Sequence, residues 1–166
     1  EMSFLQKLIL YLSHPIYSVA AVIASFLVFS GLGSQFSRHW KTRPKRVVVV
    51  AAAVIILISL AYLLVLDGWL GLTQAQPIAL RFLVACVTIA PLAFAMGHMF
   101  PTGLRQVGKD QPGLVPWAWA VNGFASVVAT VATPLLAAEL GFARVIFAAI
   151  LCYALAGVVS RWLPGK

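Results

Sequence analysis

Few residues of this chain could do chemistry, and they do not form a catalytic set. The 166 residues include four acidic residues and three histidines, and these are widely spread. A nucleophile paired with a base, a phosphate-binding loop or a metal site needs such groups at short, characteristic spacings. The chain has none of these spacings. The sequence therefore predicts no catalytic, cofactor-binding or metal-binding residue, and leaves open whether the protein has enzymatic activity.

Three polar residues fall inside or beside long apolar stretches, where polar groups are costly and often functional. Arg81 can snorkel to lipid headgroups, or it can face a cavity and bind an anion or pair with Asp67. His98 is most simply a surface-level histidine at a helix end; the alternative is a haem or chlorophyll ligand or a proton relay. Asn122 is expected to hydrogen-bond across helices to the backbone freed near residues 97–101, because an amide in lipid needs a partner.

Glu139 and Arg144 flank a predicted turn and complete the set of candidates. We interpret them as a structural ion pair across that turn in preference to a binding site. The candidate cavity or helix-contact residues are therefore Arg81, His98, Asn122, Glu139 and Arg144.

The composition predicts that lipid surrounds these candidates. The chain is 62% hydrophobic and only 10% charged, whereas about a quarter of the residues in soluble domains are charged. The apolar stretches are helix-length and lack the ten-residue alternation of an outer-membrane barrel. Both cysteines lie inside apolar stretches and are expected to be small buried hydrophobes. We predict an all-α, polytopic membrane helix bundle that forms a single domain over residues 1–166.

Five apolar stretches are long enough to cross a bilayer as helices. They cover about residues 17–36, 47–66, 78–99, 117–136 and 143–159. Residues 1–12 are helical in pattern but too short to span, so they form either an interfacial helix or the end of a spanning helix. The opening Glu1-Met2 leads us to expect that the chain is part of a longer polypeptide.

Residues 97–123 are the most polar and most Gly- and Pro-rich segment, and they lie between two of these stretches. We expect a hairpin here, with a structured loop at the membrane surface. Phe100-Pro101 is expected to stop the incoming helix, because proline disfavours a helical preceding residue and has no N–H to donate. Pro116 can begin the outgoing helix.

Small residues and breakers mark further helix contacts and ends. Ala90, Ala93 and Gly97 recur at spacings of three and four, which places a small-residue stripe on one helix face suited to close contact. The first span ends in the small-residue segment 30–34, where another backbone could approach. Asp67-Gly68-Trp69 is expected to turn the chain after the second span.

The distribution of basic residues predicts the orientation. If five spans alternate across the membrane, nine of the twelve basic residues fall on one side. They are Arg38, Lys41, Arg43, Lys45, Arg46, Arg105, Lys109, Arg161 and Lys166. The positive-inside rule makes that side cytoplasmic, together with the C-terminus. Because topology explains the net charge of +8, we expect a lipid bilayer and other membrane helices or subunits as partners, and no nucleic acid.

Four segments, taken together, carry a family resemblance: residues 14–17 (HPIY), 29–34 (FSGLGS), 97–105 (GHMFPTGLR) and 116–123 (PWAWAVNG). They resemble the C-terminal membrane region of bacterial spermidine-synthase-like integral membrane proteins. In that family a polyamine aminopropyltransferase-like domain accompanies such helices. Its catalytic fold is a soluble α/β domain that binds a decarboxylated S-adenosylmethionine-type nucleotide, and none of that domain lies in these residues.

The resemblance implies a bacterial inner-membrane domain that anchors a cytoplasmic domain. It also allows this domain to handle a polyamine-like or lipid-like molecule. The alternative is an accessory structural subunit of a larger respiratory or photosynthetic membrane complex.

Overall fold

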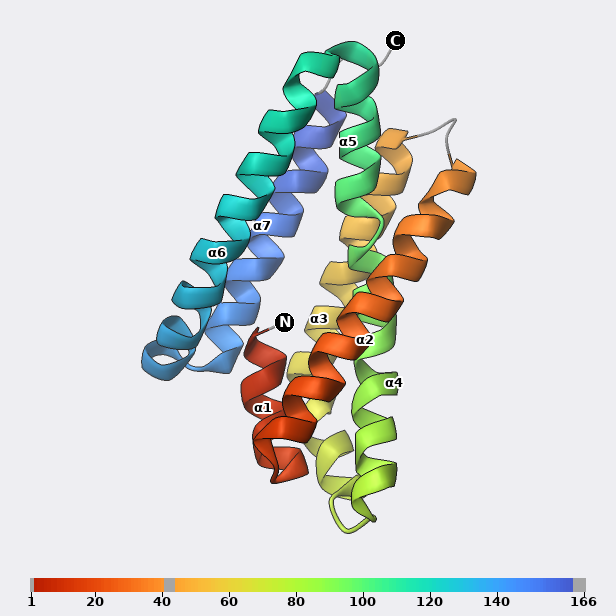
Figure 1. Ribbon diagram of the computed structural model, residues 1–166. Helices are drawn as coiled ribbons and strands as arrows, with labels where there is room; N and C mark the ends of the chain where they lie inside the picture. The colour runs from red at the N-terminus through yellow and green to blue at the C-terminus, as the bar shows by residue number, and fades with distance from the viewer. Residues whose placement is uncertain (1, 41–43, 163–166) are drawn as a thin grey trace.

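The computed structural model describes the backbone of residues 2–40 and 44–162 and the side chains of residues 5–39 and 44–160. The described chain is a helix bundle (Figure 1), which confirms the predicted all-α fold. Its α-helices are α1 (Met2–Leu12), α2 (Pro15–Phe36), α3 (Pro44–Thr73), α4 (Ile78–Met96), α5 (Met99–Asp110), α6 (Val115–Leu140) and α7 (Phe142–Trp162). Two short 3-10 turns, Ser37–Trp40 and Pro112–Leu114, precede α3 and α6.

Five helical segments are long and apolar enough to cross a membrane, as predicted. They are Pro15–His39, Pro44–Thr73, Ile78–Asp110, Pro112–Leu140 and Phe142–Ser160. Large apolar side chains cover their outward faces, and Leu64 on α3 is 86% exposed. A continuous apolar exterior of this kind is unfavourable in water and suits a hydrocarbon solvent. The chain is therefore a multi-pass membrane protein by the length and composition of its helices.

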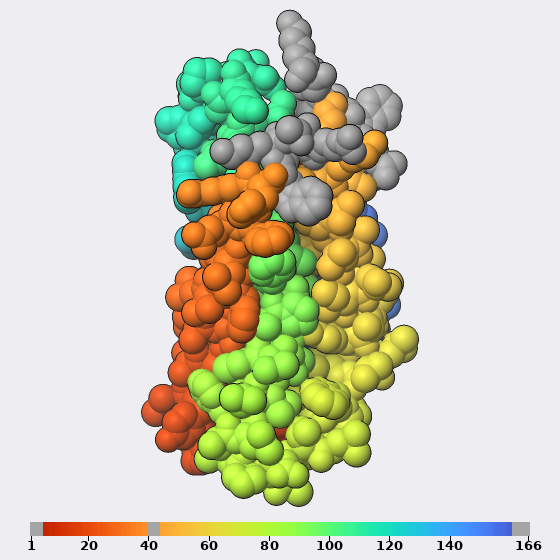
Figure 2. Space-filling view, turned by 90° about the vertical axis from the view of Figure 1, so that its right-hand side faces the viewer, coloured from red at the N-terminus to blue at the C-terminus, as the bar shows by residue number. Residues whose placement is uncertain are grey.

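Helices α2, α3 and α4 form the packed centre of the bundle, and α3 also packs along α7. Figure 2 shows α2, α4 and α3 side by side on one face. Helix α6 packs on α7 and on α1 and has no buried residue along its length. Helices α2, α3 and α4 are thus closely packed, whereas α6 lies against its neighbours without burying any of its residues.

Helix α1 packs inside one end of the bundle. Leu8, Tyr11 and Leu12 are buried among the neighbouring helices, and α1 contacts α2, α4 and α6. Ser13, with φ of 59°, and an extended His14 turn the chain into α2, and the Ser18 hydroxyl on α2 donates to the Leu8 carbonyl at 2.9 Å. These contacts bury the apolar face of α1 against neighbouring helices of the bundle.

Two glycines bring α2 and α4 into backbone contact. A Cβ atom added to Gly97 would lie 2.1 Å from the Ser30 carbonyl oxygen, and one added to Gly33 would lie 2.1 Å from the Phe94 carbonyl oxygen. Ala93, one turn before Gly97, is fully buried. The small-residue stripe on α4 and the small-residue end of α2 therefore meet; close contact was predicted for each segment, but their pairing was not.

Two predicted helix ends were wrong. Helix α3 continues through Asp67-Gly68-Trp69 to Thr73, because a backbone in an apolar medium keeps its internal hydrogen bonds through a weak breaker. The break after α4 falls at Gly97-His98, and Pro101 lies in the first turn of α5. Proline is tolerated there because first-turn N–H groups have no partner within the helix.

Candidate functional site

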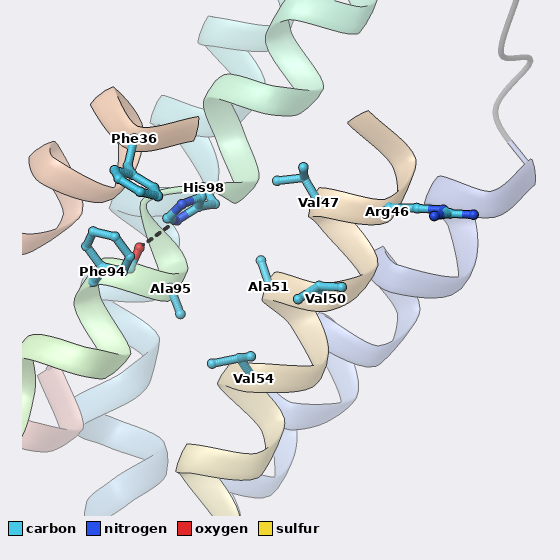
Figure 3. A pocket seen from close by; sticks show the side chains of 9 residues that line it. All are labelled: Phe36, Arg46, Val47, Val50, Ala51, Val54, Phe94, Ala95 and His98. Atoms are coloured by element: carbon cyan, nitrogen blue, oxygen red, sulfur yellow. Dashed lines mark hydrogen bonds between the residues drawn. The ribbon is translucent and has the colours of Figure 1, made fainter. Parts of the chain in front are cut away.

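A cavity of about 450 Å³ lies between α3 and the adjoining ends of α2 and α4 (Figure 3). Ala51, Ala95 and His98 are buried in its lining, whereas Phe36 and Val50 are exposed. This gradient indicates that the cavity opens on the side of the bundle. Its lining comprises Phe36, Arg46, Val47, Val50, Ala51, Val54, Phe94, Ala95 and His98.

Aromatic rings form the wall of the cavity on the α2 and α4 side. The rings of Phe36 and Phe94 are 6.0 Å apart between centroids, and those of Phe94 and His98 are 5.0 Å apart in an edge arrangement. The His39 ring lies 5.3 Å from that of Phe36, outside the described lining. Across the cavity, α3 contributes valine and alanine side chains (Figure 3). The cavity therefore favours an apolar, flexible occupant.

His98 supplies the only imidazole of this lining. Its Nδ1 lies 2.9 Å from the Phe94 carbonyl oxygen. Because a carbonyl oxygen can only accept, Nδ1 is the donor of this hydrogen bond. Gly33 allows this placement, since a Cβ there would lie 3.2 Å from Nδ1. His98 is 9% exposed, so it is a buried wall residue and not the surface-level histidine of the simpler expectation.

A buried hydrogen-bond cluster joins α5 to the end of α2 beside this cavity. Arg105 Nη1 and Nη2 each donate to the Ser37 hydroxyl at 3.1 Å. Nη2 also donates to the Ser37 carbonyl and to the Thr102 hydroxyl, both at 3.1 Å. Ser37 is fully buried and Thr102 nearly so. The cluster fixes the two segments that carry Phe36 and His98.

Arg81 lies at the opposite end of α4 from His98, so these two candidates do not share a site. Its guanidinium carbon is 5.0 Å from the centre of the Tyr11 ring, and Nε and Nη2 are buried without a hydrogen-bond partner in the described structure. The pairing with Asp67, one of the alternatives for Arg81, is not made among the described residues, where the Asp67 carboxylate contacts the Lys7 ammonium at 2.5 Å. Arg81 is thus a helix-contact residue between α1 and α4.

Asn122 does not make the predicted hydrogen bond to the 97–101 break. Its side chain is exposed on α6 and has no hydrogen-bond partner among the described residues. Trp119 reaches α5 instead, with its ring 5.0 Å from that of Phe100. The hydroxyl groups that follow Asn122 on α6 donate hydrogen bonds within the helix. Ser126 donates to the backbone carbonyl of Asn122, and Thr130 donates to the backbone carbonyl of Ser126, both at 2.8 Å.

Glu139 and Arg144 also stay apart. Both side chains are exposed, and no salt bridge joins them in the described structure. They lie on either side of Gly141, whose φ of 83° makes the predicted turn between α6 and α7. An exposed ion pair gains little free energy, which accounts for the two charges remaining separate.

Comparisons with protein-family models, with curated proteins and with solved structures each found no match. Within the described residues, no three His, Cys, Asp or Glu side chains are grouped so that they could hold a metal ion. The apolar cavity with its rim of positive charge is therefore the candidate site.

Proposed function

We propose that this chain is the membrane-embedded domain of a spermidine-synthase-like protein of the bacterial inner membrane, and that it anchors a cytoplasmic domain there. The observation that supports this most is the gathering of positive charge at one end of a five-span bundle. The described cations at that end are Arg38, Lys45, Arg46, Arg105 and Lys109. By the positive-inside rule this end faces the cytoplasm, where an attached catalytic domain would lie.

The chemistry of the cavity favours the lipid-like over the polyamine-like version of this function. A protonated polyamine needs carboxylates, and the lining contains Arg46 and no acidic residue. The described carboxylate nearest to this end in the fold, Asp110, accepts a hydrogen bond from Gln106 on the same helix. A polyamine would therefore meet repulsion at the rim and apolar walls inside.

The anchoring proposal is tested on the complete reading frame that encodes these residues. We expect an aminopropyltransferase-like α/β segment next to this region, and we expect the encoded protein to fractionate with membranes. Deleting residues 1–166 should move that segment into the soluble fraction. A reading frame without such a segment would contradict the proposal.

A second candidate function rests on α6. Its membrane-length face is unburied and carries the unpaired amide of Asn122. An amide in hydrocarbon stabilises contact with another polar helix. This combination favours the accessory-subunit alternative, in which a neighbouring subunit covers α6.

Asn122→Leu separates the two functions. The substitution is expected to change the free energy of unfolding of the isolated chain by no more than about 0.5 kcal/mol, because the side chain has no described partner to lose. The readout is the size of the complex that contains the variant chain after mild solubilisation, measured by blue-native electrophoresis. If the chain is a membrane anchor, this size should not change. If the chain is an accessory subunit, the complex should become smaller because the neighbouring subunit dissociates. Val128→Leu, on an exposed position of the same helix, is the matched control.

A further inference from the structure

We propose that the cavity between α3 and the ends of α2 and α4 binds an acyl chain of an anionic phospholipid, with the lipid phosphate held at Arg46. This site goes beyond anchoring, because a membrane anchor needs no specific lipid. Three independent features carry the inference: the length of the cavity, its opening toward the bilayer and the unpaired charge at its rim.

The cavity has the length of an acyl chain within one leaflet. Its α3 wall runs from Arg46 to Val54, and eight residues of helix rise about 12 Å. The hydrocarbon core of one leaflet is about 15 Å thick. A chain whose headgroup lies level with Arg46 would therefore contact this wall over most of its leaflet.

The cavity opens sideways, where lipid can enter. Val50 is 60% exposed and Val54 38% exposed at its edge, while Ala51 is 7% exposed at its floor. An apolar pocket of this kind does not hold ordered water well, since water there would lack polar partners.

The rim carries positive charge that has no counter-ion among the described residues. Arg46 is exposed and has no hydrogen bond or ion pair among the described residues, and Lys45 beside it is likewise unpaired there. In Figure 3 the Arg46 side chain extends from α3 away from the ring of His98, toward the side of the view on which α7 is drawn. Its guanidinium can thus sit at headgroup level while its stem stays beside the chain. Guanidinium binds phosphate oxygens strongly, so a phosphate is the complementary group.

The test is lipid retention by the purified full chain, measured by native mass spectrometry. The detergent-solubilised protein is offered equal amounts of phosphatidylglycerol and phosphatidylcholine with identical acyl chains. Wild type is expected to prefer the anionic lipid about fivefold, the effect of one cation near a phosphate surface. Arg46→Gln should abolish this preference, and Val50→Trp, which fills the cavity, should reduce retention of both lipids.

Two matched controls separate the site from general lipid adhesion. Arg144→Gln removes an exposed cation at the opposite end, and Val128→Trp adds the same bulk on α6; both should behave as wild type. Equal retention of the two lipids by wild type would overturn the proposal, as would an Arg46→Gln protein that matches Arg144→Gln. If Val50→Trp is not monodisperse, Val50→Phe gives the same readout. The anchoring proposal is tested separately by membrane fractionation, so either proposal can fail without the other.

Discussion

Replacing Gly97 with alanine is expected to lower the free energy of unfolding by about 3 kcal/mol, the upper range for overpacking. The backbone at Gly97 is helical, with φ of −60°, so alanine costs nothing locally. The cost is steric, because the new Cβ would lie 2.1 Å from the Ser30 carbonyl oxygen and would push α2 and α4 apart. Gly33→Ala should have a similar effect from the other helix. Unfolding in mixed micelles with increasing dodecyl sulfate measures both.

Gly31→Ala is the matched control, two residues from Gly33 on the same helix. A Cβ at Gly31 meets no atom within 4 Å. Alanine there should raise stability by up to about 1 kcal/mol through its better helix propensity. If Gly97→Ala and Gly33→Ala unfold at the same detergent fraction as Gly31→Ala, the close crossing of α2 and α4 is wrong.

Replacing Arg105 with alanine should destabilise the basic end of the bundle by about 2–3 kcal/mol, the range for losing charged hydrogen bonds to buried groups. The guanidinium joins Ser37 and Thr102, which both lie out of contact with solvent. Arg105→Lys should recover only part of the loss, since an ammonium cannot reproduce the planar fork. Detergent-induced unfolding again measures the loss, and hydrogen exchange at residues 36–39 should rise selectively.

Lys109→Ala supplies the comparison for Arg105. Lys109 lies one turn later on α5, is exposed and also carries one positive charge. Its removal should change stability by less than about 0.5 kcal/mol. Equal effects of Arg105→Ala and Lys109→Ala would mean that the Ser37 hydrogen bonds contribute nothing.

The span pattern was predictable because hydrocarbon imposes a strict length on each helix. Five apolar stretches, the start at Pro116 and the turn at Gly141 follow from that constraint and from local backbone chemistry. The ends of α3 and α4 were not predictable in the same way. Gly68 is a breaker in water, yet α3 continues past it, because a helix in lipid keeps its internal hydrogen bonds until a turn can be solvated. Helix α4 instead ends before Pro101, at Gly97-His98, and Pro101 falls in the first turn of α5, where proline is tolerated.

The candidate site was less accessible to sequence reasoning. His98 was a candidate because histidine is rare in apolar stretches. The cavity wall on α3 gave no such signal, because it belongs to a run of valines and alanines that does not distinguish one helix face from another. The contact between Arg105 and Ser37 joins residues 68 positions apart, and nothing in either segment signals the other. Asn122 shows the opposite failure. Its position within an apolar stretch predicted a hydrogen bond to another helix, but its side chain is exposed and has no hydrogen-bond partner among the described residues.

The central claim is that the bundle crosses the membrane five times with its basic end on one side. Substituted-cysteine labelling with an impermeant maleimide tests it most directly, in a chain whose Cys86 and Cys152 are replaced by alanine. Cysteines at the exposed positions His39 and Gln111 should label only from the cytoplasmic side, and those at Gln76 and Glu139 only from the opposite side. Labelling of Gln76 and Gln111 from the same side would contradict the account.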